Sequence, residues 1–369
     1  MTSTEITAAV VESAGAPFAL TSLELGDPQP DEVRVRMTAS GICHTDLLIR
    51  EGSFPTPMPV VLGHEGAGVV EEAGAAVTRV SVGDRIALSY ASCGGCPTCS
   101  SGRPFSCADF FARNFLAARP DGTPALSRDG EPVHSHFFGQ SSLATGAIVN
   151  ERSVVAIPDD IPSEIVAPFG CGVQTGVGSV VNALRPPAGS SIAIFGAGGV
   201  GLPAVMGAVI CGCDPIIAVD IRAGRLALAR ELGATHTVNA AETDPVEAIL
   251  DITGGGVDAS LEASGVPGIL RQAVDVLGPD SVCGLVGAPP LGTEEALDVN
   301  GLLSTGRTVR GLVEGHSVPP TFIPELVDLW REGRLPIERL VRAYDFDQIN
   351  EAADAALAGD VVKPVLRMS

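Results

Sequence analysis

The chain has 369 residues, of which 44 are acidic and 23 basic, so its formal charge at pH 7 is −21. This charge repels phosphate backbones, so we expect no nucleic-acid partner. No apolar run reaches the ~18 residues that a membrane helix needs, and no basic segment leads into an apolar core as in a secretory signal. We therefore expect a cytoplasmic globular protein of two domains without membrane contact.

The N-terminal half has the pattern of short strands. Residues 32–39, EVRVRMTA, alternate apolar Val33, Val35 and Met37 with arginines, which is typical of a half-buried strand. Similar runs, broken by glycine, proline and aspartate, fill the first ~150 residues, and no long helical period occurs before Pro162. This half predicts a β-barrel with loops.

Four cysteines in the loop 93–107 form a C-x2-C-x2-C-x7-C array: Cys93, Cys96, Cys99 and Cys107. Four thiolates can complete a tetrahedral shell around zinc and leave no open position, as a structural site requires. An iron–sulfur cluster is the alternative, but a ferredoxin-type run has three residues before its last cysteine and a proline after it. The spacing therefore predicts a structural zinc.

After Leu184 the pattern changes to apolar runs such as SIAIFGAG and PIIAVDI, which alternate with helical segments such as RAGRLALARELGA. This alternation predicts a doubly wound parallel sheet. From about His316 onward, helical segments precede a final strand, KPVLRM.

A G-x-G-x-x-G motif follows the first strand of this second half, with glycines at Gly196, Gly198 and Gly201. Such glycines let the backbone approach a pyrophosphate at a helix N-terminus. Asp220 ends the next strand and can bind the adenosine ribose hydroxyls, which favours NAD over NADP. Arg222 and Arg225 weaken this preference, unless they belong to a solvated helix surface.

Three further metal-ligand types are scattered over the β-rich half and its end, at Cys43, His64 and Cys171. Three protein ligands with a fourth position open to water or substrate make a catalytic zinc site. Each residue also has an ordinary explanation, because buried cysteines fill cores and single histidines are usually only hydrogen-bonded. Spacing alone does not join the three.

The motifs GICHTD, GHEGAGVVEEAG, GCGVQTG and IFGAGGVG…VD, together with the four-cysteine loop, resemble the zinc-dependent medium-chain alcohol dehydrogenases, in order and over essentially the whole chain. HFFGQSSLAT, NALRPPAGSSIAIFGAG, LVGAPP and KPVLR are most similar to the aryl-alcohol (benzyl-alcohol) branch. The resemblance implies an α/β protein with a GroES-like, β-rich catalytic domain (1–178), an NAD-binding Rossmann domain (179–315) and a C-terminal return to the catalytic domain (316–369).

The resemblance also implies residue roles around a catalytic zinc, whose ligands are Cys43, His64 and Cys171. Thr45 hydrogen-bonds the substrate oxygen and begins a proton relay. Asp46 orients the histidine ligand, and Glu65 lies behind the metal. With the structural site, this makes two zinc ions per chain.

For the coenzyme, the resemblance places His44 near the pyrophosphate, and Lys363 where many relatives have an arginine. The other residues that we expect to contact NAD are Thr175, Gly196, Gly198, Gly199, Val200, Gly201, Asp220, Arg225 and Val286. One position departs from the family pattern. Many relatives end the relay with a histidine at the position of Leu48, so the route of the proton to water stays open.

Phenylalanines lie at or near the positions that line the substrate pocket in relatives: Phe54, Phe110, Phe111, Phe137 and Phe138. They favour NAD-dependent, reversible oxidation of an aromatic or allylic primary alcohol to the aldehyde, although each could be ordinary core. A glutathione- or mycothiol-dependent formaldehyde dehydrogenase is an alternative that needs basic residues at the pocket mouth, for which Arg113 and Arg119 are the candidates. Another is a non-catalytic nucleotide-binding protein. Relatives form dimers and tetramers, so we expect a homo-oligomer.

Overall fold

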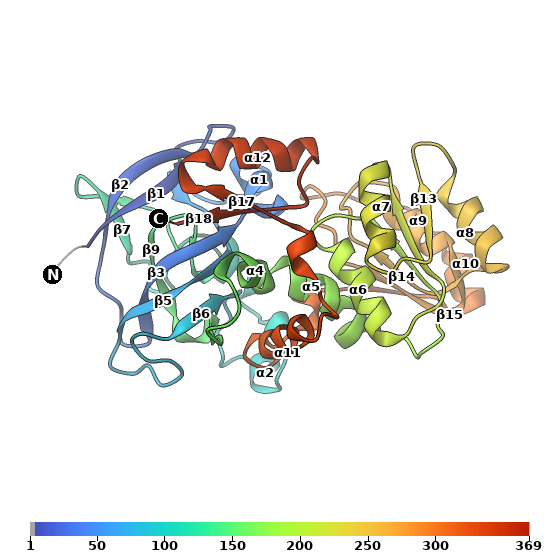
Figure 1. The fold of residues 1–369 in the computed structure, drawn as a ribbon, viewed down its shortest axis with the longest axis horizontal. Coiled ribbons are helices and arrows are strands. Elements are labelled where there is room, and N and C mark those ends of the chain that lie inside the picture. The colour runs from blue at the N-terminus through green and yellow to red at the C-terminus, as the bar shows by residue number, and fades with distance from the viewer. Residues whose placement is uncertain (1–3, 369) are drawn as a thin grey trace. The chain divides into compact units, whose positions relative to one another are not determined.

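The computed structural model describes residues 4–368, and the chain forms two compact units. The first unit contains the residues up to 171, residues 318–330 and those from 337 onward, and the second contains 172–317 and 331–336. Each unit combines strands and helices (Figure 1). None of the described helices is long and apolar enough to cross a membrane.

The first unit contains two sheets. The five-stranded sheet has the order β4-β1-β2-β7-β8, with β1 Thr4–Val11, β2 Ala19–Leu25, β4 Val60–Val61, β7 Leu126–Arg128 and β8 Glu131–Val133. The seven-stranded sheet has the order β10-β6-β5-β3-β18-β17, with β9 also paired to β3. Its strands are β3 Glu32–Gly41, β5 Glu65–Ala73, β6 Arg85–Leu88, β9 Gly146–Asn150, β10 Val154–Ala156, β17 Val341–Asp345 and β18 Lys363–Arg367.

Strand β3 confirms the period-two prediction, because Val33, Val35 and Met37 are all buried. It pairs with β5 in a register that sets Gly41 opposite Glu65, and with β18 in a register that sets Gly41 opposite Val365. The end of β3 and the start of β5 therefore meet at Gly41, beside the middle of β18, and the chain segments that follow β3 and precede β5 start from this point.

Short helices connect the strands of the first unit: α1 His44–Arg50, α2 Pro97–Ser100, α3 Phe110–Phe115, α4 Ser163–Val166 and α12 Ile349–Ala358, with α11 Pro319–Arg331 lying largely in this unit. Its 3-10 helices are η1 Pro104–Ser106, η2 Phe137–Gly139, η3 Glu151–Ser153, η4 Ala167–Gly170, η7 Ile337–Arg339 and η8 Phe346–Gln348. A core cluster that includes Ile49, Leu62, Phe137 and Leu366 packs beneath α1 and α12. Burial of this apolar surface holds α1 in place.

The second unit is built on a six-stranded parallel sheet of order β13-β12-β11-β14-β15-β16. Its strands are β11 Ile192–Phe195, β12 Ile216–Asp220, β13 His236–Asn239, β14 Val257–Glu262, β15 Leu277–Leu285 and β16 Thr308–Gly311. Its helices are α5 Gly172–Gly178, η5 Ser179–Leu184, α6 Gly201–Cys211, α7 Ala223–Glu231, α8 Pro245–Thr253, α9 Ile269–Asp275, α10 Val299–Thr305 and η6 Glu314–His316. The order, with β11 and β14 central, confirms the predicted doubly wound sheet.

Candidate metal and coenzyme sites

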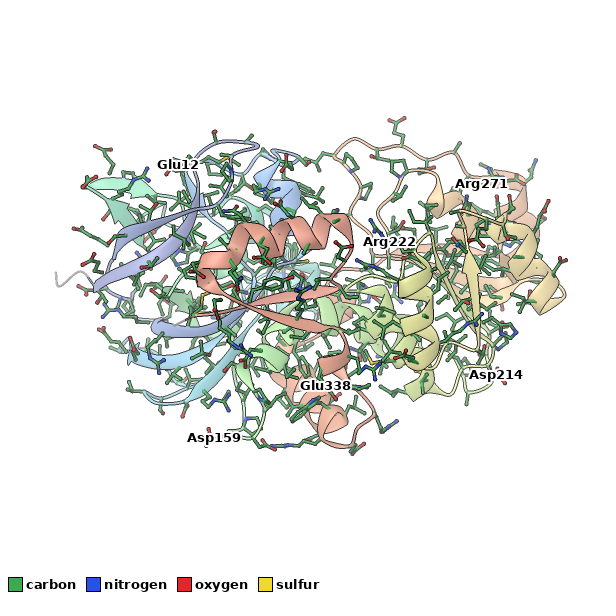
Figure 2. The ribbon with its side chains drawn as sticks, turned by 45° about the horizontal axis from the view of Figure 1, so that its top comes forward. Glu12, Asp159, Asp214, Arg222, Arg271 and Glu338 are labelled. Atoms are coloured by element: carbon green, nitrogen blue, oxygen red, sulfur yellow. The ribbon has the colours of Figure 1, made fainter. Side chains whose placement is uncertain are left out.

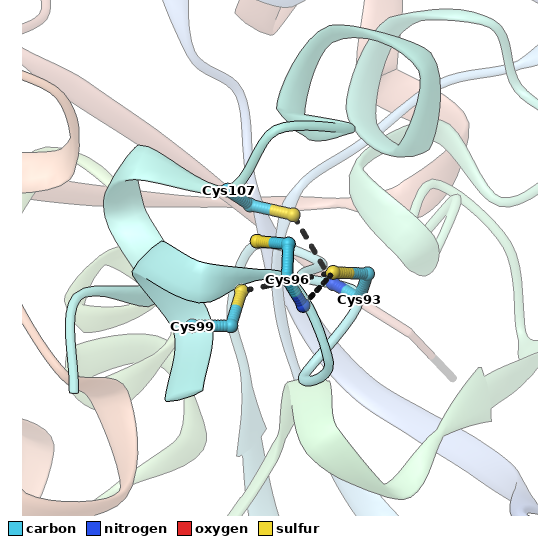
Figure 3. Close-up of side chains that lie close together, drawn as sticks. All are labelled: Cys93, Cys96, Cys99 and Cys107. Atoms are coloured by element: carbon cyan, nitrogen blue, oxygen red, sulfur yellow. Dashed lines mark hydrogen bonds between the residues drawn. The ribbon is translucent and has the colours of Figure 1, made fainter. Parts of the chain in front are cut away.

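The four cysteines of the loop 93–107 converge as predicted, and their sulfur atoms all lie within 4.8 Å of one another (Figure 3). Cys96 and Pro97 begin α2, so a single turn of helix presents both Cys96 and Cys99. The backbone N–H of Cys96 donates to Cys93 Sγ at 3.3 Å, and that of Cys93 donates to Cys107 Sγ at 3.3 Å. Such donors stabilise thiolates, so the loop fits a tetrahedral metal ion.

The protonation of these thiols is uneven. The Thr98 hydroxyl and the Ala108 N–H lower the pKa of Cys96 to about 5, and the hydroxyl oxygen lies 3.1 Å from the sulfur. Burial and the neighbouring Cys96 raise the pKa of Cys99 to about 12. Metal binding at this loop therefore has to displace protons, and its affinity will fall in acid.

A second group brings together Cys43, His64 and Cys171, whose ligand atoms also lie within 4.8 Å of one another. Cys43 is the N-cap of α1, His64 immediately precedes β5, and Cys171 follows η4. The β3–β5 register brings the first two together. At Gly170 an added Cβ would collide with the carbonyl oxygen of Leu88, so only glycine lets the third segment approach this closely.

Asp46 fixes the histidine of this group. Its carboxylate lies 2.9 Å from His64 Nδ1 and also accepts hydrogen bonds from the backbone N–H groups of Cys43 and Gly63, at 2.9 and 3.0 Å. The other ring nitrogen, His64 Nε2, is buried and makes no hydrogen bond among the described residues. A metal ion coordinated by Nε2 would satisfy this orphaned atom, so the site fits a catalytic zinc.

The charges around the group favour a thiolate. Hydrogen bonding with Cys171 lowers the pKa of Cys43 well below its usual range, although burial opposes this. Burial also opposes protonation of His64, but the Asp46 and Cys43 charges outweigh it and raise the pKa of the imidazole. The lowered pKa of Cys43 favours the deprotonated sulfur that a metal cation binds.

Glu65 and Lys363 form a buried ion pair beside this group, with Lys363 Nζ donating to Glu65 Oε1 at 2.7 Å. Gly41 makes room for the carboxylate, because an added Cβ would collide with it. Burial alone would lower the pKa of Lys363, but Glu65 and Cys43 outweigh burial and raise it. The structure thus places Lys363, which we expected at the coenzyme pyrophosphate, next to the predicted metal ligands and only 4% exposed.

Helix α1 carries the other predicted catalytic and coenzyme side chains. Thr45 Oγ1 lies 4.0 Å from Cys43 Sγ, and His44 is exposed. Thr45 therefore stands beside a predicted ligand, whereas His44 is accessible from solvent. Leu48 is half-buried and lies one turn beyond Thr45 on the same helix.

A cluster of phenylalanine rings packs against the His64 ring. Phe138 stacks on the His64 ring with centroids 4.5 Å apart and 26° between the planes, and Phe137 meets the same ring edge-on at 5.5 Å. The sequence reasoning missed Phe115, whose ring stacks with Phe54 at 5.3 Å and meets Phe138 at 5.1 Å. The available signal was its place on α3, which also carries two predicted pocket residues, Phe110 and Phe111.

The glycine-rich turn of the second unit has the geometry of a dinucleotide site. Gly196 has a φ of 94°, in the left-handed region, and at Gly201 an added Cβ would collide with the Gly196 carbonyl. An added Cβ at Gly198 would meet only Arg225 Nη1, at 3.3 Å, so the backbone there is open to a ligand. Asp220 accepts hydrogen bonds from the N–H groups of Ala197 and Arg222 at 2.8 and 2.9 Å.

Arg222 is exposed at the surface (Figure 2), whereas Arg225 is half-buried and donates to the Ala197 carbonyl at 3.3 Å. Burial lowers the pKa of Arg225, and the nearby Asp220 opposes this. The turn therefore holds one carboxylate and one guanidinium at the place where a dinucleotide's adenosine ribose would bind.

Three further residues expected to contact NAD, Thr175, Val200 and Val286, lie in the same unit. An added Cβ at Gly176 would collide with the Val200 carbonyl, so α5 packs directly against the glycine-rich turn and Thr175 lies close to it. The Thr175 hydroxyl donates to the buried carboxylate of Glu314 at 3.3 Å, a partner that sequence reasoning missed. The backbone N–H of Val286 donates to the Glu262 carbonyl at 2.9 Å, at the carboxyl end of the sheet.

Comparison with known proteins gives the family. Residues 29–159 match the alcohol dehydrogenase GroES-like domain, and residues 199–331 match the zinc-binding dehydrogenases. The geraniol dehydrogenase of Castellaniella defragrans is 44% identical over 361 residues, which cover 97% of this chain and 96% of that protein.

Two solved structures are similar over the whole chain. An alcohol dehydrogenase zinc-binding domain protein from Burkholderia ambifaria has 51% identity and a TM-score of 0.97, with 100% of both chains covered. Benzyl alcohol dehydrogenase from Acinetobacter calcoaceticus has 48% identity and a TM-score of 0.96, with 99% of this chain and 100% of that chain covered.

The fold and the two cysteine-containing groups define a zinc-binding dehydrogenase. The chain belongs to the zinc-dependent medium-chain alcohol dehydrogenases and is an alcohol oxidoreductase similar to the aryl-alcohol branch. This confirms the α/β fold with a GroES-like part and a Rossmann-type part. Its substrates are small-molecule alcohols.

Proposed function

We propose that the protein catalyses the zinc- and NAD-dependent, reversible oxidation of an aromatic or allylic primary alcohol to the aldehyde. The observation that carries the proposal is the His64 ring, which has a buried free Nε2 for the metal and the face of Phe138 stacked on it. A flat substrate bound to a metal that His64 Nε2 coordinates would lie against aromatic rings. The similarity to proteins named geraniol dehydrogenase and benzyl alcohol dehydrogenase supports this substrate class.

In this mechanism Cys43, His64 and Cys171 hold the catalytic zinc, and Asp46 keeps the imidazole oriented through Nδ1. A zinc ion bound there would make an alcohol hydroxyl more acidic, and bound NAD would supply the hydride acceptor. Thr45 Oγ1, beside the Cys43 sulfur, would accept the proton of the alcohol hydroxyl while its own O–H gives up a proton toward water. The phenylalanines exclude water and orient the substrate ring. The four cysteines of the loop 93–107 hold the second, structural zinc.

We propose NAD as the coenzyme because Asp220 stands at the end of β12 with its carboxylate fixed by two backbone N–H groups. A carboxylate there repels a 2′-phosphate, whereas ribose hydroxyls can donate to it. Arg225 is the residue that opposes this preference. It is held on the Ala197 carbonyl, which limits its reach toward a 2′-phosphate.

The structure gives little support to the thiol-dependent formaldehyde dehydrogenase. Of its two candidate arginines, Arg119 is 7% exposed and donates to both carboxylate oxygens of Glu32, at 3.0 and 2.7 Å. A guanidinium held in this way cannot receive the carboxylates of a thiol carrier. Arg113 alone stays accessible in part, with its nearest ion-pair partner, Asp109, at 3.7 Å.

One panel of assays tests the proposed function. Reduction of the nicotinamide is followed by absorbance with benzyl alcohol, geraniol, ethanol, or formaldehyde plus glutathione or mycothiol, each with NAD and with NADP. We expect the highest kcat/KM with NAD and benzyl alcohol or geraniol. A higher value for formaldehyde plus thiol would replace the proposal by the alternative, and no turnover in a metal-replete sample would favour a non-catalytic protein.

We also propose a cytoplasmic homo-oligomer assembled through the second unit. In its sheet, β16 is an edge strand, and the neighbouring α10 carries Val299 and Leu303, which are 74% and 80% exposed. An unpaired strand edge beside exposed apolar residues is a pairing surface for a second copy. Sedimentation velocity that gave only monomer would contradict this.

A further inference from the structure

The segment from His136 to Ser141, which follows β8, has an unusual backbone. Three of its non-glycine residues have left-handed φ values, 65° at His136, 51° at Phe138 and 54° at Ser141, and Gly139 has 69°. Such conformations are strained for residues with a Cβ and persist only where the surroundings fix them. The segment carries Phe137 and Phe138, so whatever fixes it also fixes the rings on His64.

The buried amide of Gln140 joins this segment to the backbone on both sides of Glu65. Gln140 is 1% exposed. Its Nε2 donates to the carbonyl oxygens of His64 at 3.0 Å and Ser89 at 3.3 Å, and its Oε1 accepts from the N–H of Gly66 at 3.1 Å. The amide therefore holds the backbone on both sides of Glu65 and uses both donors and its acceptor.

The fit between the segment and β5 is tight. At Gly66 an added Cβ would lie 3.0 Å from Gln140 Oε1 and 2.7 Å from the neighbouring Ser142 Cβ, so residue 66 has no room for a side chain here. Ser141 adds a local bond, because its hydroxyl accepts from the Phe137 N–H at 3.0 Å and donates to the Val61 carbonyl at 2.6 Å. Of these bonds, those of Gln140 alone reach the histidine itself.

We propose that Gln140 is a positioning residue for the metal centre and for substrate choice, an inference that rests on the proposed function. By holding the His64 carbonyl and the Gly66 N–H, it keeps His64 Nε2 aimed at the metal, and by the same contacts it keeps Phe138 stacked on the imidazole. One amide thus sets both the affinity of the catalytic metal and the preference for aromatic over aliphatic alcohols. No apolar side chain of similar length can replace it, because none donates or accepts.

The test compares Gln140→Met with a matched control, Asn114→Leu. Asn114 is another fully buried amide of the same unit. It accepts from the Ala91 N–H at 2.8 Å and donates to the carbonyls of Ala91 and Phe110 at 3.0 and 2.7 Å. Each substitution removes three hydrogen bonds at similar side-chain volume, but only Gln140 contacts the backbone of His64. Similar losses of unfolding free energy are expected for the two variants.

The first readout is metal release to a chelator, in which the catalytic ion is identified as the one that is missing from Cys171→Ser. We expect Gln140→Met to bind this ion about tenfold more weakly, at the lower end of the range for groups that act through a ligand, and Asn114→Leu to bind it like the wild type. The second readout is the ratio of kcat/KM for benzyl alcohol to that for hexanol. It should fall in Gln140→Met through a higher KM for benzyl alcohol. Asn114→Leu is the control for metal affinity alone, because Asn114 also holds the backbone of Phe110.

Catalytic-metal affinity in Gln140→Met equal to that of the wild type, or an equal loss in Asn114→Leu, would overturn the inference. If Gln140→Met does not fold, Gln140→Glu decides, because it keeps the acceptor for Gly66 and loses both donors, so its metal affinity should be intermediate. Wild-type affinity in Gln140→Glu would overturn the inference while the proposed function stood. A wild-type protein that bound no metal at the site of Cys43, His64 and Cys171 would overturn the proposed function and this inference together.

Discussion

The two cysteine-containing groups of the first unit are built in opposite ways. In the loop 93–107 all four ligands come from one short segment, three of the four are only half-buried, and backbone N–H groups donate to the sulfur atoms. Cys43, His64 and Cys171 come from three distant segments and lie among the buried charges of Asp46, Glu65 and Lys363. The loop 93–107, which we call the closed group because its four ligands would leave no position free, can thus form locally. The group of Cys43, His64 and Cys171, which we call the open group because a fourth position stays free for substrate, depends on the packing of the whole unit.

The largest effect that this contrast predicts is on activity. Cys171→Ser removes one ligand of the open group, and we expect it to abolish catalytic-metal binding and to lower kcat by more than the ~10–100-fold typical of residues that only support a ligand. Metal analysis should show that one of the two zinc ions is lost. The thermal midpoint of the apo-protein should change little relative to the metal-stripped wild type. Full activity in this variant would remove Cys171 from the ligand set.

The closed group should show its role in stability instead. A structural zinc contributes on the order of 10 kcal/mol of binding free energy to folding, so Cys99→Ser should lower the free energy of unfolding by several kcal/mol. Urea titration with and without chelator measures this. The control is Cys211→Ser, because Cys211 is also a half-buried free cysteine but lies outside both groups. Equal stability of the two variants would contradict a structural metal in the loop.

The same contrast explains what the sequence could predict. The four-cysteine loop and the glycine-rich turn are local patterns, so their spacing was sufficient. Cys43, His64 and Cys171 could be joined only through resemblance, because the strand register that brings Cys43 and His64 together has no local signature. Side chains whose partners lie far along the chain were less predictable. Phe115 and Gln140 were missed for this reason.

Two basic residues show most clearly what a single sequence does not predict. Lys363 was expected at the coenzyme pyrophosphate and Arg119 was a candidate for the pocket mouth of the alternative enzyme. The sequence did not indicate that each forms a buried ion pair, with Glu65 and Glu32 respectively. Charge alone predicts exposure, since lysine and arginine are almost never fully buried unless paired. The pairing depends on the tertiary fold, which a single sequence does not reveal.

A second buried ion pair of the first unit gives the next prediction, at Arg119. Burial alone would raise the pKa of Glu32, but hydrogen bonds from His136 and Arg119 outweigh it and lower the pKa from 4.5 to about 2. Since the folded-state pKa is depressed, the stabilisation is fully present above pH 4.5 and is lost as the pH falls toward about 2. Arg119→Met should therefore cost about 3 kcal/mol at neutral pH, and less at a pH near 3.

Urea titrations at the two pH values measure this difference. Arg36→Met is the control, because Arg36 forms an exposed pair with Glu71 at 3.1 Å, and exposed pairs contribute about 1 kcal/mol or less. If Arg119→Met and Arg36→Met had the same effect at both pH values, burial would add nothing to the Arg119–Glu32 pair.

The smallest effect concerns proton exit from the open group. Leu48 lies one helical turn beyond Thr45 on α1 and can neither donate nor accept a proton. Thr45→Ala should remove most alcohol oxidation, because it removes the first acceptor of the hydroxyl proton. Leu48→His would place an imidazole on the same face of the helix, within reach of that relay.

We expect Leu48→His to raise the single-turnover rate of hydride transfer at pH values below neutrality, by up to about tenfold, because an added base assists only when chemistry limits the rate. Steady-state kcat should stay nearly constant if release of the reduced coenzyme is slower than hydride transfer. Rapid-mixing absorbance of the nicotinamide over a range of pH separates the two. An unchanged single-turnover pH profile would show that protons leave the open group by a route that does not pass residue 48, with water in contact with Thr45 as the remaining acceptor.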